Sequence, residues 1–85
     1  MVLNLCGTDW DVKEGFIEED GRVDFNSQTI IINQDLHPHR KRLALTHELL
    51  HVIFDSNGID DCEGLVAMLE HRVLELINVF PEEYK

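Results

Sequence analysis

The stretch RLALTHELLHVIFD, residues 42–55, is apolar enough to form a buried helix around which the rest of the chain can pack. Apolar side chains cover most of the circumference of that helix, which is typical of a central helix rather than a surface one. Its middle nevertheless carries His47, Glu48 and His51. Three ionisable groups are costly to bury unless something pairs with them, so the pattern predicts a partner for these side chains.

Residues His47 to His51 match the pattern H-E-x-x-H. Four residues turn an α-helix by about 400°, so the two histidines lie on adjacent turns of one face. Two imidazoles stacked in this way can bind one Zn²⁺ ion at about 2.0–2.1 Å from each nitrogen. Glu48 lies to the side of the pair, where it can take a proton from a water molecule as a general base. We therefore predict that the partner is one zinc ion per chain.

A catalytic zinc needs a third protein ligand, and candidates lie on the following helix. Glu63 and Glu70 are seven residues apart and share one side of that helix, so spacing does not choose between them. Glu63 also fits a capping box with Asp60, and Glu70 also fits a solvent-facing helix flank. His71 is a further candidate ligand, although we expect it to be exposed.

The first third of the chain alternates between apolar and polar residues, as strands do. The dipeptide Asp20-Gly21 is a strong signal for a hairpin turn, and Trp10 and Phe16 are expected to share one strand face. We predict an antiparallel meander of three or four strands. Its segments are Val2–Cys6, Trp10–Phe16, a short strand with Val23 and Phe25, and Thr29–Asn33.

Two helices are predicted after the strands. The first should run from about Pro38 to Asp55 and close at Asn57 or Gly58 in the left-handed conformation. The second should begin near Asp60 or Asp61 and end before Pro81. The short connection favours an antiparallel helix pair, so the class is α+β. The apolar stripe expected on the second helix comprises Cys62, Leu65, Val66, Leu69, Val73, Leu76, Ile77 and Phe80.

Composition narrows the classes of function. The chain has 85 residues and a formal net charge of −10, which argues against a nucleic-acid partner, since binding phosphates needs a basic face. No apolar run approaches the roughly 18 residues of a membrane span, and no secretory signal is evident. We expect no membrane association and a cytoplasmic location. Cys6 and Cys62 are expected to be free thiols.

The segment TIIINQDLHPHRKRLALTHELLHVIFDSNGIDD, residues 29–61, resembles the ImmA/IrrE-type metallopeptidases, in particular the short versions encoded by phages and mobile elements. The resemblance extends from about Trp10 to Pro81, and H-E-x-x-H is its most specific part. It implies one minimal zincin-like metallopeptidase domain over residues 1–85, with a protein or peptide substrate. Family members typically act on a specific regulator, often a repressor. The strand Thr29–Asn33, expected at the sheet edge, would pair with an extended substrate.

The same resemblance implies a gluzincin-like site in which His47 and His51 are metal ligands and Glu48 is the base. In the family, a glutamate near the start of the next helix precedes an apolar residue by three positions. Here that glutamate is Glu63, before Val66, so the resemblance implies Glu63 as the third ligand. Val66 stands where the family pattern has alanine.

Two other functions fit the same residues. In the first, the protein is a non-catalytic interaction module whose zinc is structural, as small chains often need a metal for stability. In the second, it is a metal-free interaction domain whose histidines are hydrogen-bonded in the core. A Glu48→Gln variant separates an enzyme from either module. Only His71 and Tyr84 offer candidate side chains for stabilising an oxyanion.

Overall fold

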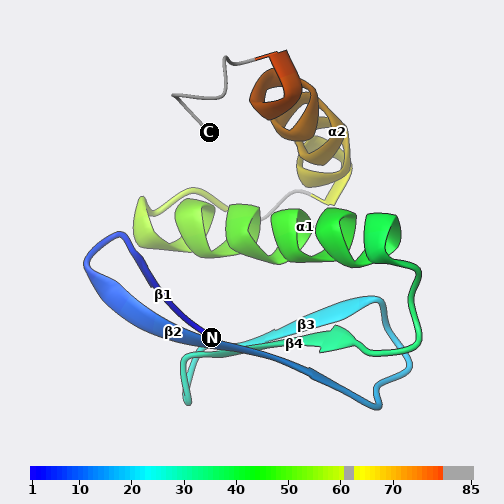
Figure 1. Cartoon of the computed structure of the whole chain (residues 1–85). Helices are drawn as coiled ribbons and strands as arrows, with labels where there is room; N and C mark the ends of the chain where they lie inside the picture. The colour runs from blue at the N-terminus through cyan, green and yellow to red at the C-terminus, as the bar shows by residue number, and fades with distance from the viewer. Residues whose placement is uncertain (61–62, 80–85) are drawn as a thin grey trace.

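A four-stranded sheet, a central helix and a second helix build the protein. The computed structural model describes residues 1–60 and 63–79. Figure 1 shows α1 along one face of the sheet and α2 on the far side of α1, so α1 is the middle layer. The predicted α+β class, sheet first and helices second, is confirmed. The elements in chain order are β1 (Val2–Leu5), β2 (Thr8–Gly15), β3 (Gly21–Asp24), β4 (Thr29–Asn33), α1 (Pro38–Ser56) and α2 (Glu63–Val79).

Helix α1 is the predicted central helix and ends one residue later than expected, at Ser56. Pro38 occupies its first turn, where the N–H that proline lacks would have no helical partner. Beyond the helix, Gly58 adopts a left-handed φ of 68°, a conformation that glycine reaches without steric cost. The predicted helix and its closure at Gly58 are therefore confirmed.

Two apolar clusters, one on each side of α1, form the core. Because both clusters include residues of α1, the helix that carries H-E-x-x-H is held from two sides. Val52 in the first cluster and Val66 in the second are fully buried. The cluster between sheet and helix comprises Trp10, Val12, Ile30, Ile32, Ala44 and Val52. The cluster between the helices comprises Leu50, Phe54 and Val66, with Ile53, Leu69 and Val73 packed around it.

The order of the strands differs from the predicted meander. The sheet has the order β1-β2-β4-β3, and β2 pairs with β4 in parallel, while the other two pairings are antiparallel. The chain leaves β2, forms β3 at the outer edge and returns through β4. The all-antiparallel prediction was wrong because alternation of apolar residues indicates which face of a strand is buried, but not which strand lies beside it.

Two further predictions depended on the antiparallel meander and are wrong for the same reason. Asp20-Gly21 does not close a hairpin between β2 and β3, because these strands are not neighbours, and Gly21 instead begins β3. The strand Thr29–Asn33 lies inside the sheet, and the edges are β1 and β3. These edge strands have four residues each, and β3 alternates with charged Arg22 and Asp24, in keeping with the short and charged edges of natural sheets.

Phe16 does not share the buried face of Trp10. The strand β2 ends at Gly15, and Phe16 beyond it is 81% exposed. Trp10 is buried, and its ring meets Phe25 edge to face with centroids 5.6 Å apart. Cys6, in the turn between β1 and β2, is an exposed free thiol as predicted.

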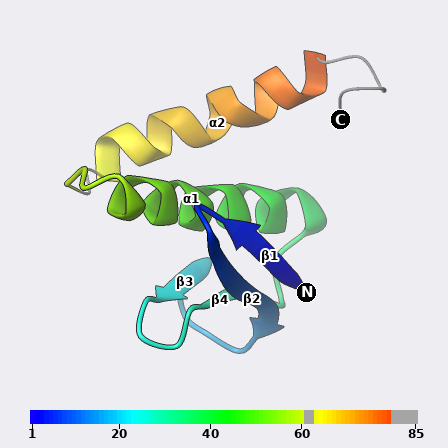
Figure 2. The same ribbon diagram turned by 90° about the vertical axis from the view of Figure 1, so that its left-hand side faces the viewer.

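Helix α2 returns across α1 and contacts it through only part of its predicted apolar stripe. Figure 1 shows α1 from the side and α2 nearly end-on, and Figure 2 shows α2 running back over α1, so the helices cross obliquely. Leu76 and Ile77 are exposed rather than packed. Asp60 lies outside the helix, while the predicted features at Asp61, Cys62, Phe80, Pro81 and Tyr84 fall outside the described residues. Within residues 1–60 and 63–79, neither helix has both the length and the apolarity needed to cross a membrane.

Candidate metal centre

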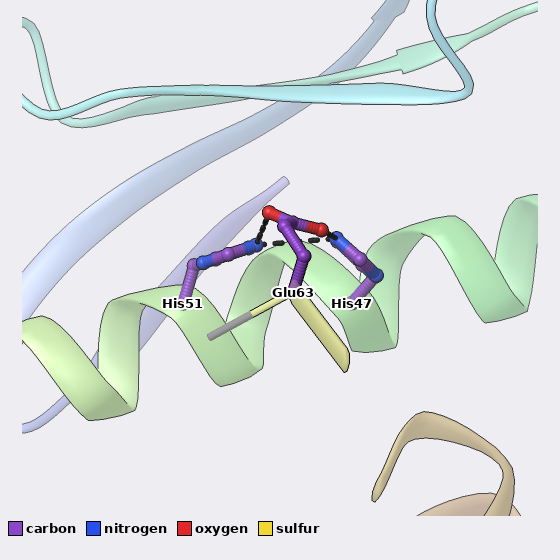
Figure 3. Close-up of side chains that lie close together, drawn as sticks. All are labelled: His47, His51 and Glu63. Carbon is purple, nitrogen blue, oxygen red and sulfur yellow. Dashed lines mark hydrogen bonds and ion pairs between the residues drawn. The ribbon is translucent and has the colours of Figure 1, made fainter. Parts of the chain in front are cut away.

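His47 and His51 project from adjacent turns of α1 toward the same point. Their Nε2 atoms lie 3.1 Å apart, and Figure 3 shows the two rings pointing at each other along the helix. This arrangement follows from the spacing of four residues, which returns a side chain to nearly the same face one turn later. The local helix therefore brings the two imidazoles together, as expected from the sequence.

Glu63, the first residue of α2, reaches the same point from the other helix. Its Oε2 lies 3.2 Å from Nε2 of His47, and its Oε1 lies 2.9 Å from Nε2 of His51. Figure 3 shows the carboxylate spanning the two rings. The glutamate that the family resemblance implied is thus the one placed beside both histidines, and it contacts them despite its expected alternative role in a capping box with Asp60.

The three side chains fit a metal ion by their chemistry and their spacing. They offer one ligand atom each, and these atoms all lie within 4.8 Å of one another. Two ligands at about 2.0–2.1 Å from a tetrahedral zinc are roughly 3.3 Å apart. The closest approaches here are 2.9–3.2 Å, which is near that spacing. Two imidazole nitrogens and a carboxylate oxygen also suit zinc.

Glu48 lies beside the histidines on α1 and is only 8% exposed. Burial raises the pKa of its carboxyl, and the carboxylates of Glu63 and Glu19 act in the same direction, whereas positive charge on the two histidines would lower it. Among the described residues, no hydrogen bond to this carboxyl group is found. A buried carboxyl group with a raised pKa and no hydrogen-bond partner in the described part of the chain is suited to taking up and releasing a proton.

Gly21 permits the position of Glu48. A Cβ atom at Gly21 would lie 3.0 Å from Cγ of Glu48 and 3.4 Å from its Oε1. The start of β3 therefore approaches α1 more closely than a residue with a side chain would allow. Sequence analysis missed this role, since it assigned Asp20-Gly21 to a hairpin turn, and no local signal connects Gly21 with a residue 27 positions later.

Glu70, the other candidate for the third ligand, lies at the opposite nitrogen of His47. Its Oε2 is 2.7 Å from Nδ1 of that ring, and its side chain is 17% exposed. The two glutamates of α2 therefore both reach His47, but only Glu63 joins the Nε2 cluster. His71 is largely exposed, as expected, and its Nε2 lies 3.8 Å from Oε1 of Glu70.

A pocket of about 460 Å³ opens beside Glu48. It lies between the N-terminal half of α1, the start of β3 and the middle of α2. Arg40 and Asp20 form an ion pair at its rim. The pocket is large enough for a side chain of a bound peptide and reaches two members of the H-E-x-x-H pattern. Its lining residues are Glu19, Asp20, Gly21, Arg40, Leu43, Ala44, His47, Glu48, Glu70 and His71.

The edge strand β3 begins at this pocket and pairs with β4 on one side only, as far as residues 1–60 and 63–79 show. Asn33 N–H donates to the carbonyl of Asp20 over 2.9 Å, so these two residues form a hydrogen-bonded pair. Such pairs alternate along an antiparallel ladder. In the register Gly21↔Ile32 and Val23↔Ile30, the backbone groups of Gly21 and Val23 therefore point away from β4, toward the free edge.

Comparison with known proteins gives one family. The model of the IrrE N-terminal-like domain, peptidase family M78, matches residues 11–69. This range includes most of β2, all of β3, β4 and α1, and the first part of α2, and with them His47, His51 and Glu63. No curated protein and no solved structure matches the chain significantly.

Proposed function

The chain belongs to the IrrE N-terminal-like domain family of peptidases, and from this membership we propose that it is a zinc-dependent peptidase acting on a protein substrate. The observation that carries the proposal is the convergence of His47, His51 and Glu63 beside the buried Glu48. A ligand set and an adjacent base are the two parts that metal-assisted hydrolysis requires.

In this proposal His47, His51 and Glu63 would hold one zinc ion, the first two through Nε2 and the third through its carboxylate. Two nitrogen ligands and one oxygen ligand from the protein are the kind of ligand set that catalytic zinc sites have. When bound, zinc polarises a substrate carbonyl and lowers the pKa of a water molecule toward neutrality.

Glu48 moves the proton. It takes one from the attacking water as the oxygen adds to the peptide carbonyl carbon, and then gives it to the leaving amine nitrogen as the C–N bond breaks. The burial of Glu48 supports this role, because it limits the access of bulk water to the carboxyl group that carries the proton.

The substrate is proposed to lie along β3 as an added strand. The outward backbone groups of Gly21 and Val23 support this placement, because an extended peptide can pair with them and pass the pocket at Glu48. The edge strand is thus β3 rather than Thr29–Asn33. By resemblance to the ImmA/IrrE type, we propose that the substrate is a specific regulator in the cytoplasm.

A structural zinc in a non-catalytic module remains the second candidate. It is favoured by the fact that the cluster joins α1 to α2, since a metal held by both helices would fasten them together. The two functions differ in what they require of Glu48. An enzyme needs its carboxyl group, whereas a structural site needs only the three ligands.

The experiment compares wild type with Glu48→Gln, His51→Ala and the control Glu75→Gln, an exposed change on α2. Native mass spectrometry measures zinc per chain, and a peptide library with mass-spectrometric detection measures cleavage. We expect one zinc in every protein except His51→Ala, and cleavage by wild type and Glu75→Gln alone. Zinc without cleavage in wild type would favour the structural module, and wild type that binds no zinc would overturn both candidates.

A further inference from the structure

We propose that Glu70 is a positioning residue that holds His47 in the orientation and hydrogen placement needed for binding a metal through Nε2. The contact that carries this proposal is the 2.7 Å separation between Oε2 of Glu70 and Nδ1 of His47. Both side chains are substantially buried, at 17% and 24% exposure, so water competes little for the contact.

The chemistry of this contact determines which nitrogen of the His47 ring carries hydrogen. A carboxylate oxygen only accepts hydrogen bonds, so Nδ1 of His47 must carry the proton and donate it to Glu70. A neutral imidazole has one N–H and one lone pair, so in the neutral ring the lone pair falls on Nε2, where a metal would take the place of the hydrogen that the Glu63 carboxylate could otherwise accept. Nε2 is the atom that lies 3.1 Å from His51 and 3.2 Å from Glu63. Glu70 thus directs the lone pair into the cluster.

Both glutamates that contact His47 belong to helix α2, and each contacts a different nitrogen of the ring. Glu63 and Glu70 are two turns apart on the same side of α2, so a single docked helix reaches Nε2 and Nδ1 of one ring. Val66 lies between them in the chain and is fully buried against Leu50 and Phe54. This packing sets the register of α2, and with it the approach of both carboxylates to His47.

The inference rests on the proposed function, because orienting His47 matters only if the ring binds a metal. The hydrogen at Nδ1 does not depend on that metal and can be observed in the metal-free protein. Carboxylates that hydrogen-bond a histidine ligand generally contribute about 10–100-fold to metal affinity. We expect a loss in this range when the acceptor at position 70 is removed, and a smaller loss when a neutral acceptor replaces the carboxylate.

The test uses Glu70→Leu, which keeps apolar volume without an acceptor, and Glu70→Gln, which keeps an acceptor without charge. Glu75→Leu on the same helix is the control, because its carboxylate pairs only with Arg72 among the described residues. Two-bond ¹H–¹⁵N spectra of the metal-free full chain report which His47 nitrogen carries hydrogen. Chelator competition with Zn²⁺ reports affinity.

We expect Nδ1–H at His47 in wild type, Glu70→Gln and Glu75→Leu, and loss of that preference with about 10–100-fold weaker zinc binding in Glu70→Leu. A wild-type His47 protonated at Nε2 alone would overturn the inference without any variant. Equal affinities of the Leu and Gln variants would also overturn it, because a purely packing role does not distinguish an acceptor. If wild type binds no Zn²⁺, the proposed function fails, and the position of the hydrogen still decides the role of Glu70.

Discussion

Gly21 lies against Glu48 so closely that a methyl group at position 21 would come within 3.0 Å of Cγ of the glutamate. The first residue of an edge strand therefore determines where the proposed base can sit on α1. The contact joins the sheet to the helix between two residues that line the pocket. An alanine at position 21, which adds only a Cβ methyl group, is therefore enough to test the importance of this close approach.

Gly21→Ala is expected to displace Glu48 and to lower kcat by up to about 100-fold, because a shift of about 1 Å in a catalytic group can cost that much. Zinc content should stay at the wild-type level, since His47, His51 and Glu63 do not touch Gly21 in the close approaches found. Steady-state kinetics and metal analysis measure the two effects.

The matched control for this substitution is Gly64→Ala on α2. A Cβ atom there meets nothing within 4 Å, and alanine favours a helix by about 0.5–1 kcal/mol over glycine. Wild-type activity with equal or greater stability is the expected outcome. If both alanine variants lost activity alike, the close approach at Gly21 would not be the cause.

Glu48→Gln is expected to stabilise the metal-free protein at neutral pH. Burial raises the pKa of Glu48 above its ordinary value of 4.5, so the folded state binds this proton more tightly than the unfolded state. Stability of the wild type therefore falls as pH rises from the ordinary pKa through the raised one, whereas glutamine has no charge to bury. Thermal unfolding between pH 4 and pH 7 measures the difference in Tm.

The sign of that difference is the critical result. A gap in Tm that widens in favour of glutamine from pH 4 to pH 7 agrees with a buried carboxylate that is costly to ionise. Because about 1 kcal/mol corresponds to roughly 4–8 °C in a domain of this size, even a modest cost is measurable. A constant gap across this range would contradict the direction of the pKa shift.

Zinc is expected to raise Tm, because it binds ligands on both α1 and α2 that the unfolded chain holds apart. Free zinc at 100 times its Kd adds about 2.7 kcal/mol, which is roughly 10–20 °C here. Calorimetry with a chelator and then with zinc measures the change. His51→Ala should remove the increase, and a full increase in that variant would argue against the His–His–Glu site.

Val66→Ala is expected to destabilise the protein by about 2 kcal/mol, since it opens a cavity in the fully buried cluster between the helices. Zinc affinity should fall with it, because Val66 sets how α2 presents Glu63 and Glu70. Met68→Ala is the matched control on the same helix, at a side chain that is 56% exposed. Chemical denaturation and chelator competition compare the two variants.

The helix and the His47–Glu48–His51 arrangement could be predicted from the sequence because both are local. The apolar pattern located α1 to within one residue at its end, and a spacing of four residues places two histidines on one face of any α-helix. The same pattern could not order the strands. Alternation in β2 and β4 marks the buried face, but the parallel pairing of these strands depends on contacts between segments far apart in the chain.

Only the tertiary structure showed which atoms Glu63 and Glu70 contact. Both lie on the same side of α2, so spacing in the sequence left both open, and only the family resemblance pointed to Glu63. The way α2 crosses α1 places Glu63 at Nε2 of His47 and Glu70 at Nδ1, because the buried Val66 fixes the helix against its neighbour. The close approach of Gly21 to Glu48 likewise depends on how β3 packs against α1. Spacing along one helix is set by its own backbone geometry, whereas the approach of a second element is set by packing among residues that no local pattern connects.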